Sequence, residues 1–101
     1  MKRVYMCFST DILHSGHINI IRRAAKLGEL TVGVLTDEVI ASFKRYPLIP
    51  LQERILLFES LAGVHRVVVQ DTLSYEKILR ELRPQVVVHG DDWRVGYQAS
   101  I

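Results

Sequence analysis

Short apolar runs alternate along this chain with segments whose apolar residues recur at helical spacing. The apolar runs have the length and composition of buried strands, and they cover residues 4–8, 30–35, 67–69 and 86–88. The segments between them predict helices over residues 18–27, 37–44, 52–62 and 75–82. Strands that alternate with helices in this way predict an α/β fold, with a parallel sheet, right-handed crossovers and flanking helices.

Residues with strong end preferences mark the boundaries of these helices. Thr36 can cap the second helix, whose first turn carries Asp37 and so complements the helix dipole. Gly63 is expected to end the third helix, because glycine readily adopts the backbone conformation that follows a helix. Ser74 and Pro84 mark the beginning and the end of the fourth helix in the same way.

The composition is that of an ordinary globular domain. Of the 101 residues, 49% are hydrophobic and 24% are charged, so we expect residues 1–101 to form a single domain with one core. The formal net charge of +2 is too small to predict a nucleic-acid surface. No apolar run approaches the length that crosses a membrane, and no secretion signal precedes the first strand. We therefore expect neither a nucleic acid nor a membrane as partner.

Cys7 is the only cysteine, so the chain can form no intrachain disulfide. It lies within the first apolar run, where we expect a buried strand residue. A chain without disulfides fits a reducing compartment, and the expected location is the cytoplasm.

A polar segment with two histidines follows the first predicted strand and opens the first helix. Its sequence is Ser9-Thr10-Asp11-Ile12-Leu13-His14-Ser15-Gly16-His17. Two imidazole donors at positions i and i+3, together with the free backbone N–H groups of a helix start, can surround one anion. Gly16 lets the backbone approach that anion closely. The segment therefore predicts a site for nucleotide phosphate.

Two other interpretations of His14 and His17 stay open at this point. A zinc site needs three or four convergent ligands, and the remaining histidines, His65 and His89, lie on different predicted elements. We expect no protein-bound metal. A purely structural role is disfavoured by Gly16, which lies between the two histidines. The segment also lacks the features of the Walker loop and of the glycine-rich dinucleotide fingerprint, so it belongs to a separate class.

A second polar segment follows the fourth predicted strand. It reads His89-Gly90-Asp91-Asp92-Trp93. In open parallel sheets, ligands bind beyond the carboxyl ends of the strands, where the strand order reverses. Both polar segments follow strands, so we expect them to share that edge of the sheet.

Four segments carry a resemblance to a known family. They are Ser9 to His17, Leu35-Thr36-Asp37, Lys44-Arg45-Tyr46-Pro47 and Val88-His89-Gly90-Asp91-Asp92-Trp93. Together they resemble the His-x-Gly-His nucleotidyltransferases, and within these the cytidylyltransferase domain fused to phosphoenolpyruvate mutase in phosphonate biosynthesis. The resemblance implies a Rossmann-like nucleotidyltransferase fold. It also implies transfer of CMP from CTP to a small phosphonate or phosphate alcohol, with release of pyrophosphate.

Three residues carry the predicted catalysis. His14 and His17 are expected to donate hydrogen bonds to the triphosphate oxygens as charge grows toward the leaving pyrophosphate. The resemblance implies that Lys44 bridges the acceptor phosphate and the nucleotide. The nucleotide contacts that we expect are Ser9, Thr10, His14, Gly16, His17, Asp91 and Asp92. The resemblance alone places the two aspartates near the base and ribose.

The acceptor side is assigned to Asp11, Lys44 and Arg54. Asp11 can orient either its own loop or the acceptor. Arg54 lies in the first turn of a predicted helix, where its charge opposes the dipole and so requires a partner. That partner is either the acceptor anion or a carboxylate, and the sequence leaves both open.

The chain departs from the family pattern after Trp93. Cytidylyltransferases have an arginine-containing, Ser/Thr-rich segment there, and residues 94–101 do not supply it. We therefore expect an incomplete domain with weak activity. The resemblance implies a homodimer, which an open apolar sheet edge would also favour. Mg²⁺ is expected to be carried by the nucleotide triphosphate. An adenylyltransferase of the same superfamily and a non-catalytic nucleotide-binding module remain as alternatives.

Overall fold

The computed structural model describes residues 2–8, 15–42, 45, 47–89 and 92–95. In chain order the elements are β1 (Arg3–Phe8), α1 (Ser15–Ala25), β2 (Glu29–Leu35), α2 (Asp37–Ala41), α3 (Leu51–Glu59), β3 (Val64–Gln70), α4 (Glu76–Leu82), β4 (Val86–His89) and β5 (Asp92–Val95). The strands form one sheet in the order β3-β2-β1-β4-β5. The first four strands are parallel, which confirms the predicted α/β fold with a parallel sheet.

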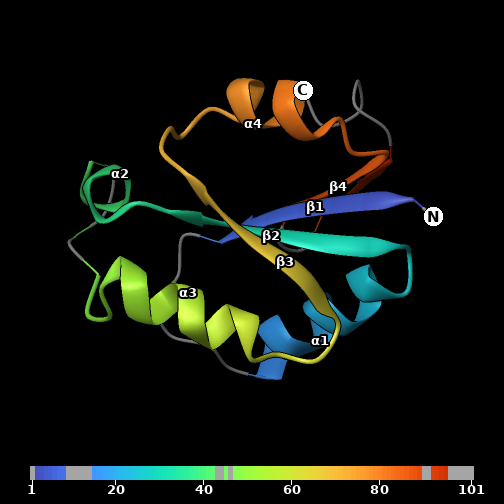
Figure 1. Cartoon of the computed structure of the whole chain (residues 1–101), viewed down its shortest axis with the longest axis horizontal. Helices are drawn as coiled ribbons and strands as arrows, with labels where there is room; N and C mark the ends of the chain where they lie inside the picture. Colours follow the sequence, from blue (N-terminus) through green and yellow to red (C-terminus); the bar gives the residue numbers. More distant parts are fainter. Residues whose placement is uncertain (1, 9–14, 43–44, 46, 90–91, 96–101) are drawn as a thin grey trace.

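Helices cover both faces of this sheet (Figure 1). Helices α1 and α3 lie on one face, and α4 lies on the other. Successive side chains of a strand point to opposite faces, so β1 contributes Val4 and Met6 to the first core and Tyr5 to the second. Phe8, at the end of β1, belongs to the first core. The amphipathic periods in the sequence therefore correspond to two apolar layers around a buried central strand.

Thr36 caps α2 as the sequence predicts. Its hydroxyl oxygen accepts a hydrogen bond from the backbone N–H of Val39 at 3.2 Å. The helix ends at Ala41, whereas the sequence predicted a helix as far as residue 44. Helix α3 ends at Glu59, and Gly63 follows with φ of +93° in the turn before β3. Glycine is suited to that turn, since a side chain is strained at positive φ.

The antiparallel strand β5 was not predicted from the sequence. Asp92 pairs with His89 and Trp93 pairs with Val88, so the second polar segment continues into a strand beside β4. Residues 92–95 alternate polar and apolar side chains, and the preceding Gly90-Asp91 is typical of a two-residue hairpin turn. The sequence therefore contained a signal for this strand, but an alternation over only four residues does not by itself predict a strand.

A buried hydrogen bond connects β1 to β3 across the intervening strand. The Tyr5 hydroxyl donates to Oε1 of Gln70 at 2.6 Å, and Nε2 of Gln70 donates to the carbonyl of Thr72 at 2.8 Å. The Tyr5 side chain passes directly over Gly33 on β2, where a Cβ atom would lie 1.7 Å from the hydroxyl oxygen. Gly33 is therefore required by close packing, and the buried polar groups are paired as they need to be.

Cys7 lies half-buried on the same face of the sheet, next to Tyr5 and Tyr75. Burial raises the pKa of its thiol to about 12, although hydrogen bonds with the two tyrosines oppose the shift. The thiol is therefore protonated at physiological pH, as expected for an inert cysteine on a buried strand.

In the part of the chain that the structure describes, we find no helix with the length and apolar character needed to cross a membrane.

Gly33→Ala is expected to lower the free energy of unfolding by about 2 kcal/mol, because overpacking a rigid core typically costs about 1–3 kcal/mol. Urea unfolding of the variant measures this cost. The same substitution in a Tyr5→Ala background should cost much less, because the clashing ring is gone. An equal cost in both backgrounds would show that Tyr5 is not the obstacle.

Cys7 should react with iodoacetamide at pH 8 roughly a thousandfold more slowly in the folded chain than in the urea-unfolded chain, since each pKa unit lowers the thiolate population about tenfold. Mass spectrometry of timed samples gives both rates. A folded rate close to the unfolded rate would contradict the raised pKa.

Candidate functional site at the carboxyl edge of the sheet

The strand order reverses at the carboxyl ends of β1 and β4. From β1 the chain builds the sheet outward through β2 and β3, and it then crosses over to place β4 on the other side of β1. Such a switch point leaves a crevice in which ligands bind in open α/β sheets. Helix α1 begins beside it at Ser15, and the paired strand ends His89 of β4 and Asp92 of β5 lie next to it. The structure thus brings the described parts of the two predicted polar segments, residues 15–17 and residues 89, 92 and 93, to one edge.

Several predicted site residues lie outside the described residues. These are Ser9, Thr10, Asp11, His14, Lys44 and Asp91. Their assignments remain predictions from the sequence. The backbone of Asp92 is described, and it lies opposite His89 at the carboxyl end of β4. Gly16 and His17 lie in the first turn of α1.

The imidazole of His17 lies at the boundary of the first core. Its ring packs edge-on against Phe8, with 5.8 Å between the ring centroids and an interplanar angle of 74°. Phe8 in turn stacks on Phe58 of α3, at 5.0 Å and 25°. His17 is half-buried, so the aromatic contact restrains one side of the ring. This environment limits the directions in which the imidazole can donate a hydrogen bond.

The N-terminal turn of α1 suits an anion. It contains no acidic side chain, whereas Arg22 and Arg23 lie in the last turn, where basic residues complement the helix dipole. The positive end of the dipole at Ser15 to His17 is therefore not offset within the helix. The first turn of a helix generally favours anions, because its backbone N–H groups point toward the positive end of the dipole.

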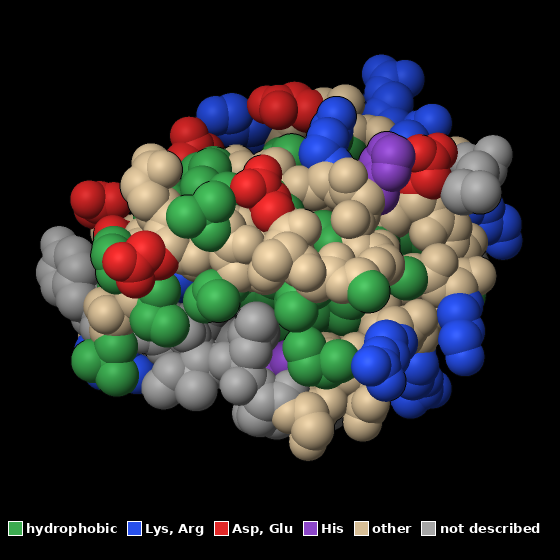
Figure 2. All heavy atoms as spheres, turned by 60° about the horizontal axis from the view of Figure 1, so that its bottom comes forward, with side chains coloured by type: hydrophobic (Ala, Val, Ile, Leu, Met, Phe, Trp, Pro, Cys, Tyr) green, Lys and Arg blue, Asp and Glu red, His purple; other side chains and the backbone are tan. Residues whose placement is uncertain are grey.

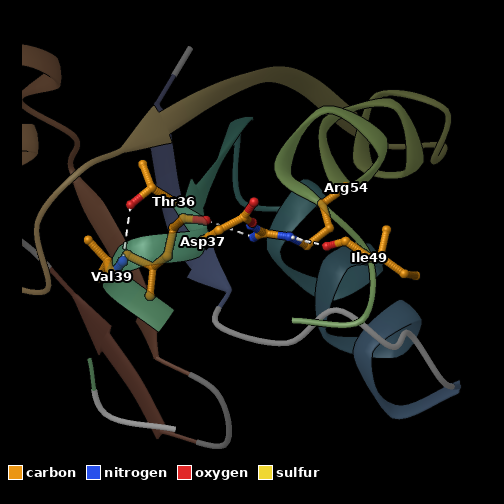
Figure 3. A network of polar contacts seen from close by, with 6 residues as sticks. Thr36, Asp37, Val39, Ile49 and Arg54 are labelled. Atoms are coloured by element: carbon orange, nitrogen blue, oxygen red, sulfur yellow. Dashed lines mark hydrogen bonds and ion pairs between the residues drawn. The ribbon is translucent and has the colours of Figure 1, made fainter. Parts of the chain in front are cut away.

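Arg54 is fully buried and has three acceptors (Figure 3). Its Nε donates to the carbonyl of Ile49 at 3.0 Å, and Nη1 donates to the carbonyl of Leu35 at 2.7 Å. Its Nη2 forms an ion pair with Oδ1 of Asp37. Of the two partners that the sequence left open for Arg54, the structure provides the carboxylate. Direct contact between Arg54 and an acceptor anion stays a prediction from the sequence.

Asp37 is the residue at this edge that the sequence interpretation did not assign to the site. From the sequence it was given a favourable charge in the first turn of α2 and a place in one segment of the family resemblance, without a role in the site. Its side chain is 28% exposed and pairs with the buried guanidinium of Arg54. A signal for this pair existed in the sequence, because Arg54 opposed a helix dipole and needed a negative partner.

Among the described residues, no group of three or more histidine, cysteine, aspartate or glutamate side chains converges as metal ligands would.

Comparisons with known proteins agree with this fold. The cytidylyltransferase-like family matches residues 7–98. An FAD synthase of Methanopyrus kandleri is 35% identical over 95 residues, covering 90% of this chain and 63% of that protein. An ethanolamine-phosphate cytidylyltransferase of Arabidopsis thaliana is 35% identical over 96 residues, covering 89% of this chain and 23% of that protein.

Two further relatives extend the picture. A bifunctional protein HldE of Streptomyces coelicolor is 39% identical over 90 residues, covering 86% of this chain and 19% of that protein. A lipopolysaccharide core biosynthesis protein from Thermoplasma volcanium has a similar structure, with a TM-score of 0.80 and 31% sequence identity, over 86% of this chain and 72% of that one.

The chain spans at most 63% of the length of the three curated relatives named above. The family match nevertheless extends over nearly all of the sequence. With its Rossmann-like sheet and flanking helices, the chain belongs to the cytidylyltransferase-like family of the nucleotidyltransferase superfamily.

Proposed function

We propose that this chain transfers CMP from CTP to a small phosphate or phosphonate alcohol and releases pyrophosphate. The observation that carries the proposal is the position of His17, in the first turn of α1 beside the switch point of a cytidylyltransferase-like domain. A cytidylyltransferase acting on ethanolamine phosphate is among the relatives, which supports a phosphate acceptor. The phosphonate acceptor, and fusion to a phosphoenolpyruvate mutase domain, rest on the sequence resemblance alone.

The proposed reaction needs alignment more than acid–base chemistry. An oxygen of the acceptor phosphate attacks the α-phosphorus of CTP, and the bond from that phosphorus to the oxygen of the leaving pyrophosphate breaks. The attacking oxygen is already anionic, so neither a serine nucleophile nor a strong base is required. His14 and His17 donate hydrogen bonds to the triphosphate oxygens, and Gly16 gives room for the backbone to approach them.

Other predicted residues complete the site. Ser9 and Thr10 bind phosphate oxygens, while Asp91 and Asp92 contact the ribose and base. On the acceptor side, Asp11 orients the acceptor and Lys44 lowers the repulsion between the two anions. Mg²⁺ carried by the triphosphate would supply charge neutralisation there, and we assign no residue of the chain to hold it.

Transfer of AMP from ATP is the second candidate function. An FAD synthase is among the relatives, and FAD contains an adenine nucleotide. Hydrogen bonds to the triphosphate do not discriminate between bases, so the same His17 chemistry serves either nucleotide. A non-catalytic nucleotide-binding module is the third alternative.

We also propose that the chain is cytoplasmic and forms a homodimer. The side formed by α3 and β3 exposes apolar residues, among them Leu56, Leu57 and Val69. Figure 2 shows apolar side chains in a band across this side, among scattered charged ones. Among the described strands, β3 lies at an edge of the sheet and pairs only with β2, and such edges favour association with another chain. Sedimentation of the chain at increasing concentration tests the dimer.

His17→Ala should lower the rate of CMP transfer roughly a hundredfold or more, because removing one donor to a developing phosphate charge costs about 3–4 kcal/mol. Single-turnover release of pyrophosphate from CTP, with enzyme in excess, measures this even if turnover is slow. His65→Ala is the matched control, since His65 is exposed and pairs with Glu29 at the opposite end of the strands. Equal rates for the two variants would refute the assigned role of His17.

CTP with Mg²⁺ should raise the melting temperature more than ATP with Mg²⁺ at the same concentration. A ligand that binds the folded chain more tightly stabilises it more at a given concentration. A larger shift with ATP would favour the adenylyltransferase.

Ethanolamine phosphate and 2-aminoethylphosphonate, which differ by one ester oxygen, then separate the two acceptor classes in the pyrophosphate assay. Binding of CTP without any pyrophosphate release at high enzyme concentration would favour the non-catalytic module.

A further inference from the structure

The guanidinium of Arg54 joins three separate parts of the chain. Through Leu35 it holds the carboxyl end of β2, through Asp37 the first turn of α2, and through Ile49 the residues that precede α3 (Figure 3). Arg54 itself lies in the first turn of α3. We define the α2–α3 connector as residues 42–50, of which 43, 44 and 46 lie outside the described residues. The contacts of Arg54 hold helix α2, which precedes the connector, and Ile49, near the end of it.

The charge of Arg54 is already neutralised within the protein. Its side chain has no exposed surface, and its three nitrogen atoms donate to two carbonyls and one carboxylate. Burial of a cation is costly unless it is paired and hydrogen-bonded in this way. A guanidinium whose three nitrogen atoms already donate to these acceptors is suited to hold backbone in place. It is poorly suited to bind a substrate anion from solvent.

Only arginine can make this set of contacts from one side chain. The three acceptors are reached by three different nitrogen atoms of a rigid planar fork. Lysine has a single ammonium group and can approach one of these acceptors at a time. The geometry thus requires the shape of arginine as well as its charge.

We propose that Arg54 and Asp37 are positioning residues for the acceptor side of the site, acting through the α2–α3 connector. The inference rests on the proposed function, because the acceptor-binding lysine predicted from the sequence, Lys44, belongs to this connector. It revises the role of Arg54 itself, which holds the connector and does not touch the acceptor. The pair sets where the acceptor's phosphate group meets the nucleotide, and it contributes little to nucleotide affinity.

Native-state proteolysis tests the first half of this proposal without any assay of activity. Trypsin cleaves after Arg45, an exposed residue of the connector. Arg54→Lys and Asp37→Asn should each raise the rate of that cleavage roughly tenfold or more, because local opening no longer breaks the buried contacts. Mass spectrometry identifies the cut, and urea unfolding of each variant gives its global stability.

Two control variants separate local release from general destabilisation. Leu79→Ala removes a buried side chain of α4 on the opposite face of the sheet and lowers stability without touching the connector. Arg80→Lys alters an exposed ion pair with Glu76 on the same helix. Both should leave cleavage after Arg45 within roughly twofold of the parent rate under native conditions. Cleavage that follows global stability equally in all four variants would overturn the proposal.

Steady-state kinetics test the second half. With ethanolamine phosphate or 2-aminoethylphosphonate as acceptor, Arg54→Lys should raise the acceptor KM roughly tenfold while the CTP KM changes by less than about twofold. A purely structural defect would lower the active fraction, and so kcat, and leave both KM values unchanged. An equal rise in both KM values, or a change in kcat alone, would contradict a role in acceptor positioning.

The two experiments also distinguish this inference from the proposed function. If the parent chain releases no pyrophosphate from CTP with either acceptor, the transfer reaction is refuted. The proteolysis result still decides whether Arg54 and Asp37 hold the connector. If CMP transfer proceeds and Arg54→Lys behaves like Leu79→Ala in both experiments, the positioning role alone is wrong.

Discussion

The burial of β1 at the centre of the sheet is the constraint on which the rest of the structure depends. It hydrogen-bonds to β2 along one edge and to β4 along the other, so its backbone groups are satisfied within the sheet. Its side chains enter two different cores, with Met6 on one face and Tyr5 on the other. Because the strand order reverses around β1, the crevice at its carboxyl end is a direct result of this topology. Phe8 ends the strand at that crevice and supports His17.

Polar contacts join several elements at the carboxyl edge of the sheet. Gln70 accepts the buried hydroxyl of Tyr5 through its side chain, and its backbone carbonyl accepts the N–H of Thr36 at 3.3 Å. Asp37, the residue after Thr36, forms an ion pair with Arg54 of α3. Loops at a sheet edge bury little apolar surface, so directional bonds have to set their geometry. Buried polar groups carry a large penalty when one partner is lost, which makes such an edge well defined.

The sequence predicts features that depend on neighbouring residues better than features that depend on residues far apart along the chain. The run at 30–35 predicted β2 within one residue, and the Thr36 cap was correct, because both depend on neighbouring residues. The sequence also indicated that Arg54 needs a partner, yet Asp37 lies 17 residues away and only the tertiary fold brings the two together. Strand β5 was missed for a similar reason, because a four-residue strand is defined by its pairing with β4. The helix beginning at Ser15 places His17 near the switch point, as the sequence suggested, while its contact with Phe8 required coordinates.

Helix α3 connects the two sides of the proposed reaction. Arg54 and Phe58 are four residues apart, so they lie on the same face of the helix, and both are buried. Arg54 holds β2 and α2, on the acceptor side of our proposal, whereas Phe58 stacks on Phe8, which contacts His17 on the nucleotide side. A helical turn is rigid, so the spacing between these two anchors cannot change independently of the helix. In the proposed reaction, in-line displacement at phosphorus depends on the alignment of two anions, and one rigid element that supports both contacts would keep that alignment. A buried arginine is a costly way to attach a helix, and the proposed reaction would give a reason for its presence here.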